Sequence, residues 1–202
     1  MARRASPEIN AGSMADIAFL LLIFFLVTTT MESDSGISRK LPPMQDENIT
    51  PPIIKERNIF KVIVNANDEL LVEDELMELK DVRQAAIDFL DNGAGVGPDA
   101  CDYCQGAKDP NSSVNPKIAV IMLSNDRGTT YGTYIAVQNE LVGAYNELRD
   151  RTAQRMFGKP FTQMEADFND VRYTGNKDRL KEQIEQVRDM WPQKLSEADP
   201  KN

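Results

Sequence analysis

The chain has 202 residues, of which 41% are hydrophobic and 27% are charged, and its net charge is −9. This length suits one ordinary domain with an added tail or anchor, and the composition argues against wholesale disorder. The acidic balance argues against a general nucleic-acid-binding protein, because neutralising phosphates requires a basic face. The chain has no histidine, which excludes Ser-His-Asp and Cys-His catalysis and removes the commonest zinc ligand.

One long apolar run stands near the N-terminus, from Ile17 to Val27. With its flanks it covers residues 14–31, which as a helix would measure about 27 Å, close to the ~30 Å hydrocarbon core of a bilayer. We therefore expect residues 14–31 to form a single transmembrane helix. Two alternatives stay open. One is a cleaved signal peptide, although no Ala-x-Ala site follows Val27; the other is a buried core helix, although apolar side chains on every face suit lipid better.

The charges around this run predict its orientation. Arg3 and Arg4 precede the apolar run, and basic residues favour the cytoplasmic side of a membrane. Residues 1–13 are therefore expected in the cytoplasm, and everything after residue 31 beyond the inner face of the membrane. That outer part carries the whole net charge of −9.

The chain after the apolar run begins with a predicted linker, residues 32–56, which is rich in Pro and Ser and has almost no apolar periodicity. Residues 59–64 predict a strand, and residues 70–72 are expected to return as its hairpin partner. From Leu79 to Leu90 the apolar residues recur every three or four positions, which predicts an amphipathic helix.

A segment rich in Gly, Asn and Pro, residues 92–116, is predicted to be an insertion or long loop. The apolar residues 117–123 predict a central strand, and a second amphipathic helix follows through Leu148. Residues 150–189 are charged and mostly helical in pattern, and residues 190–196 are predicted to form a last short strand.

These elements together predict one small α/β domain over residues 57–198, with helices on one face of a mixed sheet. Residues 150–189 are treated as a helical extension of that domain. Their last predicted helix has a narrow apolar stripe, compatible with packing on the sheet or against a partner helix. The stripe consists of Leu180, Ile184 and Val187.

Asp16 is the only charged residue in the predicted span. An ionised carboxylate at bilayer depth costs several kcal/mol unless it is paired, hydrated or protonated. Two interpretations stay open: an interfacial acid that reaches the headgroups, and a functional site of reversible protonation. A single carboxylate on one helix cannot form a pathway alone, so the second interpretation requires partner helices. The residues that follow on its helical face are Leu20, Ile23, Val27 and Thr30. We predict that these four residues, with Asn10 and Thr28, support Asp16.

Three threonines, Thr28 to Thr30, close the apolar run. They could hydrate the outer end of a proton pathway, or they could satisfy helical carbonyls and mark the end of the span.

Cys101 and Cys104 form a CxxC pair inside the predicted insertion. A zinc site would need two more ligands, and a thioredoxin-like redox pair would open a helix after a strand. A short-loop disulfide in an oxidising compartment is the preferred interpretation. We predict no metal site and no resident cofactor.

Two segments resemble the ExbD/TolR family. Glu8-Ile9-Asn10, followed by Asp16 and an apolar stretch that ends in threonines, is similar to the family's N-terminus, in which an acid-Ile-Asn element precedes an intramembrane aspartate. Residues 121–132 resemble the family's strand, Asp-Arg/Lys turn and following helix. Ser13 departs from the pattern, because many members have a proline between the asparagine and the aspartate. The resemblance covers most of residues 6–149.

The turn in the second segment, Asp126-Arg127-Gly128, has two interpretations. It could be a periplasmic contact site. It could equally be a strand-to-helix connection, in which Gly128 allows the backbone to turn and Thr129 or Thr130 caps the helix.

The resemblance implies a non-enzymatic, single-pass subunit of the bacterial inner membrane, with its N-terminus in the cytoplasm and its domain in the periplasm. Family members form homodimers inside a ring of multi-span ExbB- or TolQ-type subunits, and protons cross by way of the aspartate, which Asp16 matches. The motion is passed to a TonB- or TolA-type effector. The expected function is therefore to use the proton motive force to energise TonB-dependent outer-membrane transport.

Three other functions remain as alternatives: a TolR-like role in envelope integrity, a stator for surface motility, and a membrane-tethered binding module in which Asp16 is inert. An enzyme is not expected, because no nucleophile–base pair, phosphate-binding glycine loop or metal-ligand set appears in the sequence.

Overall fold

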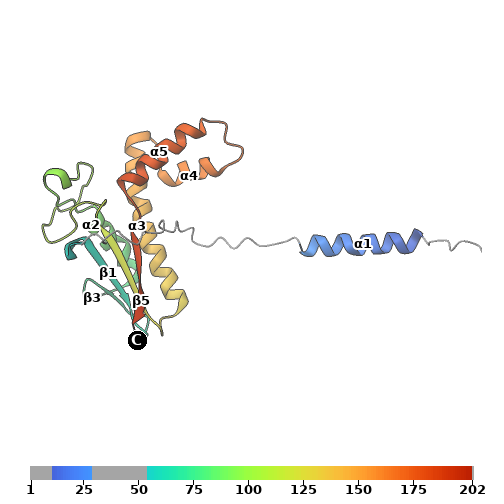
Figure 1. Ribbon diagram of the computed structural model, residues 1–202, viewed down its shortest axis with the longest axis horizontal. Helices are drawn as coiled ribbons and strands as arrows, with labels where there is room; N and C mark the ends of the chain where they lie inside the picture. Colours follow the sequence, from blue (N-terminus) through green and yellow to red (C-terminus); the bar gives the residue numbers. More distant parts are fainter. Residues whose placement is uncertain (1–10, 29–53, 202) are drawn as a thin grey trace, which may run out of the picture. The chain divides into compact units, whose positions relative to one another are not determined.

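The computed structural model describes residues 11–28 and 54–201. The chain divides into two units, Met1–Thr50 and Pro51–Asn202. Figure 1 shows helix α1 in the first unit and an α/β domain in the second. Several predicted features lie outside the described residues: Asn10, Thr30 and all of the predicted linker up to residue 53.

Helix α1 runs from Ala11 to Thr28 and consists almost entirely of apolar residues. Its large apolar side chains are exposed on all sides, from 41% for Ile23 to 65% for Leu26. It begins three residues before the predicted span, whose last three residues lie outside the description. No helix within residues 11–28 and 54–201 combines the length and the apolar character that crossing a bilayer requires. The transmembrane helix therefore stays a prediction.

The α/β domain is built on a five-stranded mixed sheet with the strand order β3-β2-β1-β4-β5. Neighbours β1–β2 and β2–β3 are antiparallel, whereas β1–β4 and β4–β5 are parallel. The predicted mixed sheet is thus confirmed. The strands are β1 (Ile59–Val64), β2 (Leu70–Val72), β3 (Glu75–Met77), β4 (Val120–Asp126) and β5 (Leu195–Lys201).

One face of the sheet carries the core. In β1 every second residue is buried, including Val62 and Val64, and Ile121 and Leu123 of β4 are buried likewise. Helices α2 (Leu79–Leu90) and α3 (Tyr131–Phe157) contribute buried residues to the same core and pack against each other (Figure 1). The stripes that predicted these two helices are therefore their core-facing sides.

The charged region after residue 149 is helical, as its pattern predicts. Helix α3 continues to Phe157 and ends at Gly158, which has a left-handed φ of 72°, and α4 (Phe161–Asn169) and α5 (Lys177–Met190) follow. Because β5 then pairs with β4 at the edge of the sheet, this segment is an insertion within the domain and not an extension beyond it.

Three strand predictions need correction. Strand β3 was not predicted, because its turn uses Glu73 and Asp74 at positive φ instead of the glycine or asparagine that normally indicates such a turn. The strand predicted at residues 117–123 begins only at Val120, because the chain still turns around Asn115, whose carbonyl oxygen accepts from the N–H groups of residues 118 and 119. The strand predicted at residues 190–196 is wrong over residues 190–194, because β5 begins at Leu195.

That error has a physical reason. Met190 is the last residue of α5 and Trp191 is fully buried, so their apolar character reflects a helix end and a core position. Strand pairing begins at Leu195, opposite Ile121.

Candidate functional site

Asp16 lies in the second turn of α1 and is exposed there. It is the only charged residue of that helix. Leu20 and Ile23 follow one and two turns later on the same face. The helix thus presents one carboxyl group in an otherwise apolar surface, and such a group can exchange a proton where water reaches it.

The residues predicted to support Asp16 are only partly described. Val27 and Thr28 belong to α1, but the positions of their side chains are not described, and Asn10 and Thr30 lie outside the described residues. The predicted supporting face therefore stays a prediction.

The turn at Asp126 lies between β4 and α3. One carboxylate oxygen of Asp126 accepts from the backbone N–H of Gly128 at 2.9 Å, so this side chain stabilises its own turn. A Cβ on Gly128 would lie 2.8 Å from the Cβ of Ala66, in the β1–β2 loop. Glycine is therefore required here by a close approach and not, as the sequence suggested, by an unusual backbone conformation. Arg127 is exposed.

Two threonines fix this turn to its surroundings. The hydroxyl group of Thr129 donates to the carbonyl oxygen of Asn65, just after the end of β1, at 3.0 Å. The side chain of Thr130 accepts from the backbone N–H of Thr133 and caps α3, while its own N–H donates to Asp68. The arrangement is that of a strand-to-helix connection, and the contact site predicted at this turn stays a prediction.

Cys101 and Cys104 are joined by a disulfide, with their Cα atoms 5.5 Å apart. Gly93, at a φ of 65°, makes room for it, because a Cβ there would lie 2.6 Å from the Cβ of Cys104. Within the described residues no group of three or more metal ligands occurs. The structure therefore agrees with the preferred interpretation of this CxxC pair, a short-loop disulfide.

The loop closed by the disulfide holds Tyr103 against the end of α5. The Tyr103 hydroxyl donates to the carbonyl oxygen of Met190 at 2.8 Å, and its ring meets the Trp191 ring edge-on at 5.3 Å. Burial raises the pKa of Tyr103 to about 12. The two inserted segments, residues 92–116 and the helices after α3, therefore pack on each other.

Trp191 and Arg149 form the centre of this packing, which the sequence did not predict. The indole N–H of Trp191 donates to the hydroxyl oxygen of Thr152 at 2.8 Å. Arg149, only 7% exposed, donates twice to the carbonyl oxygen of Trp191, and the rings of Tyr145 and Phe161 lie beside its guanidinium. Burial lowers the pKa of Arg149. No sequence signal separates this structural arginine from the surface arginines around it.

An ion pair joins the end of α2, next to the first insertion, to α3. Arg151 lies 2.8 Å from a carboxylate oxygen of Asp91, without the angle of a hydrogen bond, and the same oxygen accepts from the backbone N–H of Gln105. Asp91 is 5% exposed and caps the end of α2. These contacts are structural and provide no group for chemistry.

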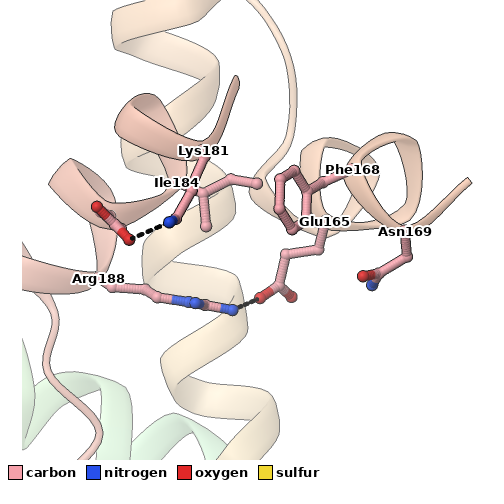
Figure 2. Close-up of a pocket in the computed structure, with 7 residues that line it drawn as sticks. Glu165, Phe168, Asn169, Lys181, Ile184 and Arg188 are labelled. Atoms are coloured by element: carbon pink, nitrogen blue, oxygen red, sulfur yellow. Dashed lines mark hydrogen bonds and ion pairs between the residues drawn. The ribbon is translucent and has the colours of Figure 1, made fainter. Parts of the chain in front are cut away.

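A small cavity of about 140 Å³ lies between α4 and α5. Figure 2 shows that Arg188 reaches across it to Glu165 and that Lys181 points to a neighbouring carboxylate. The guanidinium of Arg188 lies 2.5 Å from a carboxylate oxygen of Glu165. Phe168 and Ile184 provide its apolar wall. Its charged groups satisfy one another, so the cavity has the character of a helix–helix seam and not of a reactive site.

The comparisons with known proteins agree with the resemblance noted in the sequence. A family model described as biopolymer transport protein ExbD/TolR matches residues 2–149, which include Asp16, the disulfide loop and the Asp126 turn. No curated protein matches the chain. The matched part covers most of the chain and all elements from α1 through most of α3. The chain belongs to the ExbD/TolR family of biopolymer transport proteins.

Proposed function

We propose that this chain is the proton-carrying subunit of an inner-membrane motor, anchored by α1, with its α/β domain in the periplasm. Membership of the family supports the general role of a subunit that energises biopolymer transport. The finer proposal is an ExbB-ExbD-type complex that uses the proton motive force to drive TonB-dependent transport across the outer membrane. The partners would be a multi-span ExbB- or TolQ-like ring, a TonB-like effector and a second copy of this chain.

The observation that carries the proposal is that one family match contains both Asp16 and the α/β domain as far as residue 149. The apolar surface of α1 supports the anchor. Exposing apolar side chains to water costs about 25 cal/mol per Å². Side chains such as Phe19, Phe24 and Leu26 are each at least 60% exposed, so lipid or partner helices must cover them.

Asp16 supplies the chemistry of the proposal. A charged carboxylate favours a hydrated or polar niche between partner subunits, whereas the protonated group tolerates an apolar wall. Taking up or releasing one proton therefore changes which neighbour the helix prefers. Repeated exchange across a proton gradient would bias the motion of a helix pair within the ring, and the domain would pass that motion to the effector.

The test is the substitution Asp16→Asn in the full chain, assembled with its ring subunit. The proposal expects loss of proton conductance in proteoliposomes and loss of the energised transport, with Asp16→Glu keeping part of both. Asp189→Asn, the same change at an exposed position of α5, is the matched control and leaves both intact. If Asp16→Asn retains both activities, the chain is a tether and not a proton carrier.

A second measurement separates the TonB branch from the TolA branch. Deletion of a TonB-branch subunit abolishes energised uptake through outer-membrane receptors while the envelope stays intact. Deletion of a TolR-like subunit gives the reverse result: uptake continues, but the envelope leaks and becomes sensitive to detergent. A motility stator would leave both unchanged and stop surface movement.

A further inference from the structure

A cleft of about 220 Å³ opens where the chain enters the α/β domain. Residues 54–58 form one side of it, the first insertion and the start of β4 form another, and Lys194 comes from the segment before β5. Val114 and Val120 provide apolar wall. The cleft lies at the start of β4, whereas the turn at Asp126 follows the end of that strand, and it shares no lining residue with the cavity between α4 and α5.

Asn58 is the buried polar group of this cleft and is only 4% exposed. Its side-chain oxygen accepts from the backbone N–H of Val114 at 3.0 Å, which fixes the orientation of the amide. Among the described residues its Nδ2 group has no hydrogen-bond partner, and this group is accessible to solvent in the cleft. A buried amide with two unused donors lining a cleft is suited to an acceptor-rich ligand.

The charges around Asn58 favour an anion. Lys55, Arg57 and Lys194 line the cleft against one carboxylate, that of Asp99. Arg57 is held in place by donating to the carbonyl oxygen of Pro110 at 3.1 Å, and the ammonium of Lys194 donates to the carbonyl oxygen of residue 117. This local positive surplus stands in a chain whose net charge is −9. An anion with several oxygen acceptors, such as a phosphate group, matches both the charge and the free amide donors.

We propose that this cleft binds the phosphate group of an anionic phospholipid and so seats the domain on the membrane surface. The cleft has the mixed character of a membrane-surface contact, because Ile54 and Ile118 are 38% and 36% exposed beside its cations. It also lies at the first described residues of the domain, after residues 29–53, which connect it to α1. The inference rests on the membrane anchor of the proposed function.

The experiment uses the full chain in lipid nanodiscs made of phosphatidylcholine alone or with phosphatidylglycerol. Lysine acetylation followed by mass spectrometry measures how accessible each ammonium group is. Acetylation of Lys55 should slow about fivefold in the phosphatidylglycerol discs, the effect expected for one cation held at an anionic surface. Lys80 and Lys181, which are exposed on α2 and α5, should change less than about twofold and serve as controls within the same chain.

Two variants test the residues of the cleft. Asn58→Asp keeps the oxygen that binds the Val114 N–H but replaces the free donors with a negative charge, so it should abolish the protection of Lys55. Lys55→Gln changes an exposed position without touching the fold, and protection of Lys194 should then fall about fivefold. Lys80→Gln, its matched control, should leave the protection of Lys55 unchanged.

Three outcomes would overturn the inference. The first is equal acetylation of Lys55 in both kinds of disc, and the second is protection of Lys55 that survives in Asn58→Asp. The third is protection of Lys55 in phosphatidylcholine discs by inorganic phosphate or a hexaglutamate peptide instead of by the anionic lipid. Failure of the anchor is seen separately, because the chain then does not co-elute with the discs of phosphatidylcholine alone. In that case vesicles of phosphatidylglycerol still test the cleft through the labelling of Lys55.

Discussion

The substitution Thr152→Val should destabilise the α/β domain through a single hydrogen bond. Trp191 is fully buried and Thr152 is 2% exposed, and the indole N–H donates to the threonine hydroxyl at 2.8 Å. Valine has nearly the same shape as threonine, so the change opens no cavity and removes only the acceptor. A buried donor left without a partner costs about 1–3 kcal/mol. For a domain of this size that lowers the Tm by about 2–12 °C.

A double-mutant cycle with Trp191→Phe isolates this bond. Phenylalanine has no N–H group, so Thr152→Val should cost almost nothing in the Trp191→Phe background, and the coupling free energy should be about 1–3 kcal/mol. Thermal unfolding of the full chain in detergent, followed by circular dichroism, measures all four variants. If Thr152→Val lowers the Tm equally in both backgrounds, the hydrogen bond is not the cause and the assigned role of Trp191 is wrong.

Two further predictions concern the Asp126 turn and Tyr103. Gly128→Ala should lower the free energy of unfolding by about 1–3 kcal/mol, because the new Cβ would meet the Cβ of Ala66 at 2.8 Å. Gly132→Ala is the control, because a Cβ there meets open space and should cost no stability. Equal unfolding midpoints of the two variants in urea would contradict this prediction. The pKa of Tyr103 is raised to about 12 by burial, so its contribution to stability is complete below about pH 10 and is lost as the pH rises through 12. Tyr103→Phe should remove part of that alkaline fall in stability, while Tyr131→Phe, at an exposed tyrosine, should keep it.

Elements with strong periodicity were predictable from the sequence. The alternation in Ile59–Val64 identified β1 with its observed bounds, and the stripe from Leu79 to Leu90 identified α2, because in both cases one face of a regular element is buried in the core. The hairpin β1–β2 followed from the turn residues between them. Local pattern suffices where burial on one side is the only requirement.

Other features depend on contacts between distant parts of the chain and leave no local pattern. The sequence does not distinguish Trp191 as a core residue that meets Tyr103 and Thr152, or Asn58 as a buried amide of a cleft, because these contacts join segments separated by tens of residues. The motif around Asp16 was readable for the opposite reason: a charge within a long apolar run is anomalous by itself.

The topology of the sheet decides where the two insertions gather. The first insertion leads into β4 and the second into β5, and these strands are parallel neighbours, so both insertions must arrive at the same end of the sheet. The contacts of Tyr103 with Met190 and Trp191 are the consequence. The turn at Asp126 follows the other end of β4, and its hydrogen bonds to Asn65 and Asp68 stay within the family match, although Lys201 of β5 also pairs with Asp126. On the proposed function, we therefore expect the effector to meet the turn end, because the two insertions pack on each other at the opposite end of the sheet.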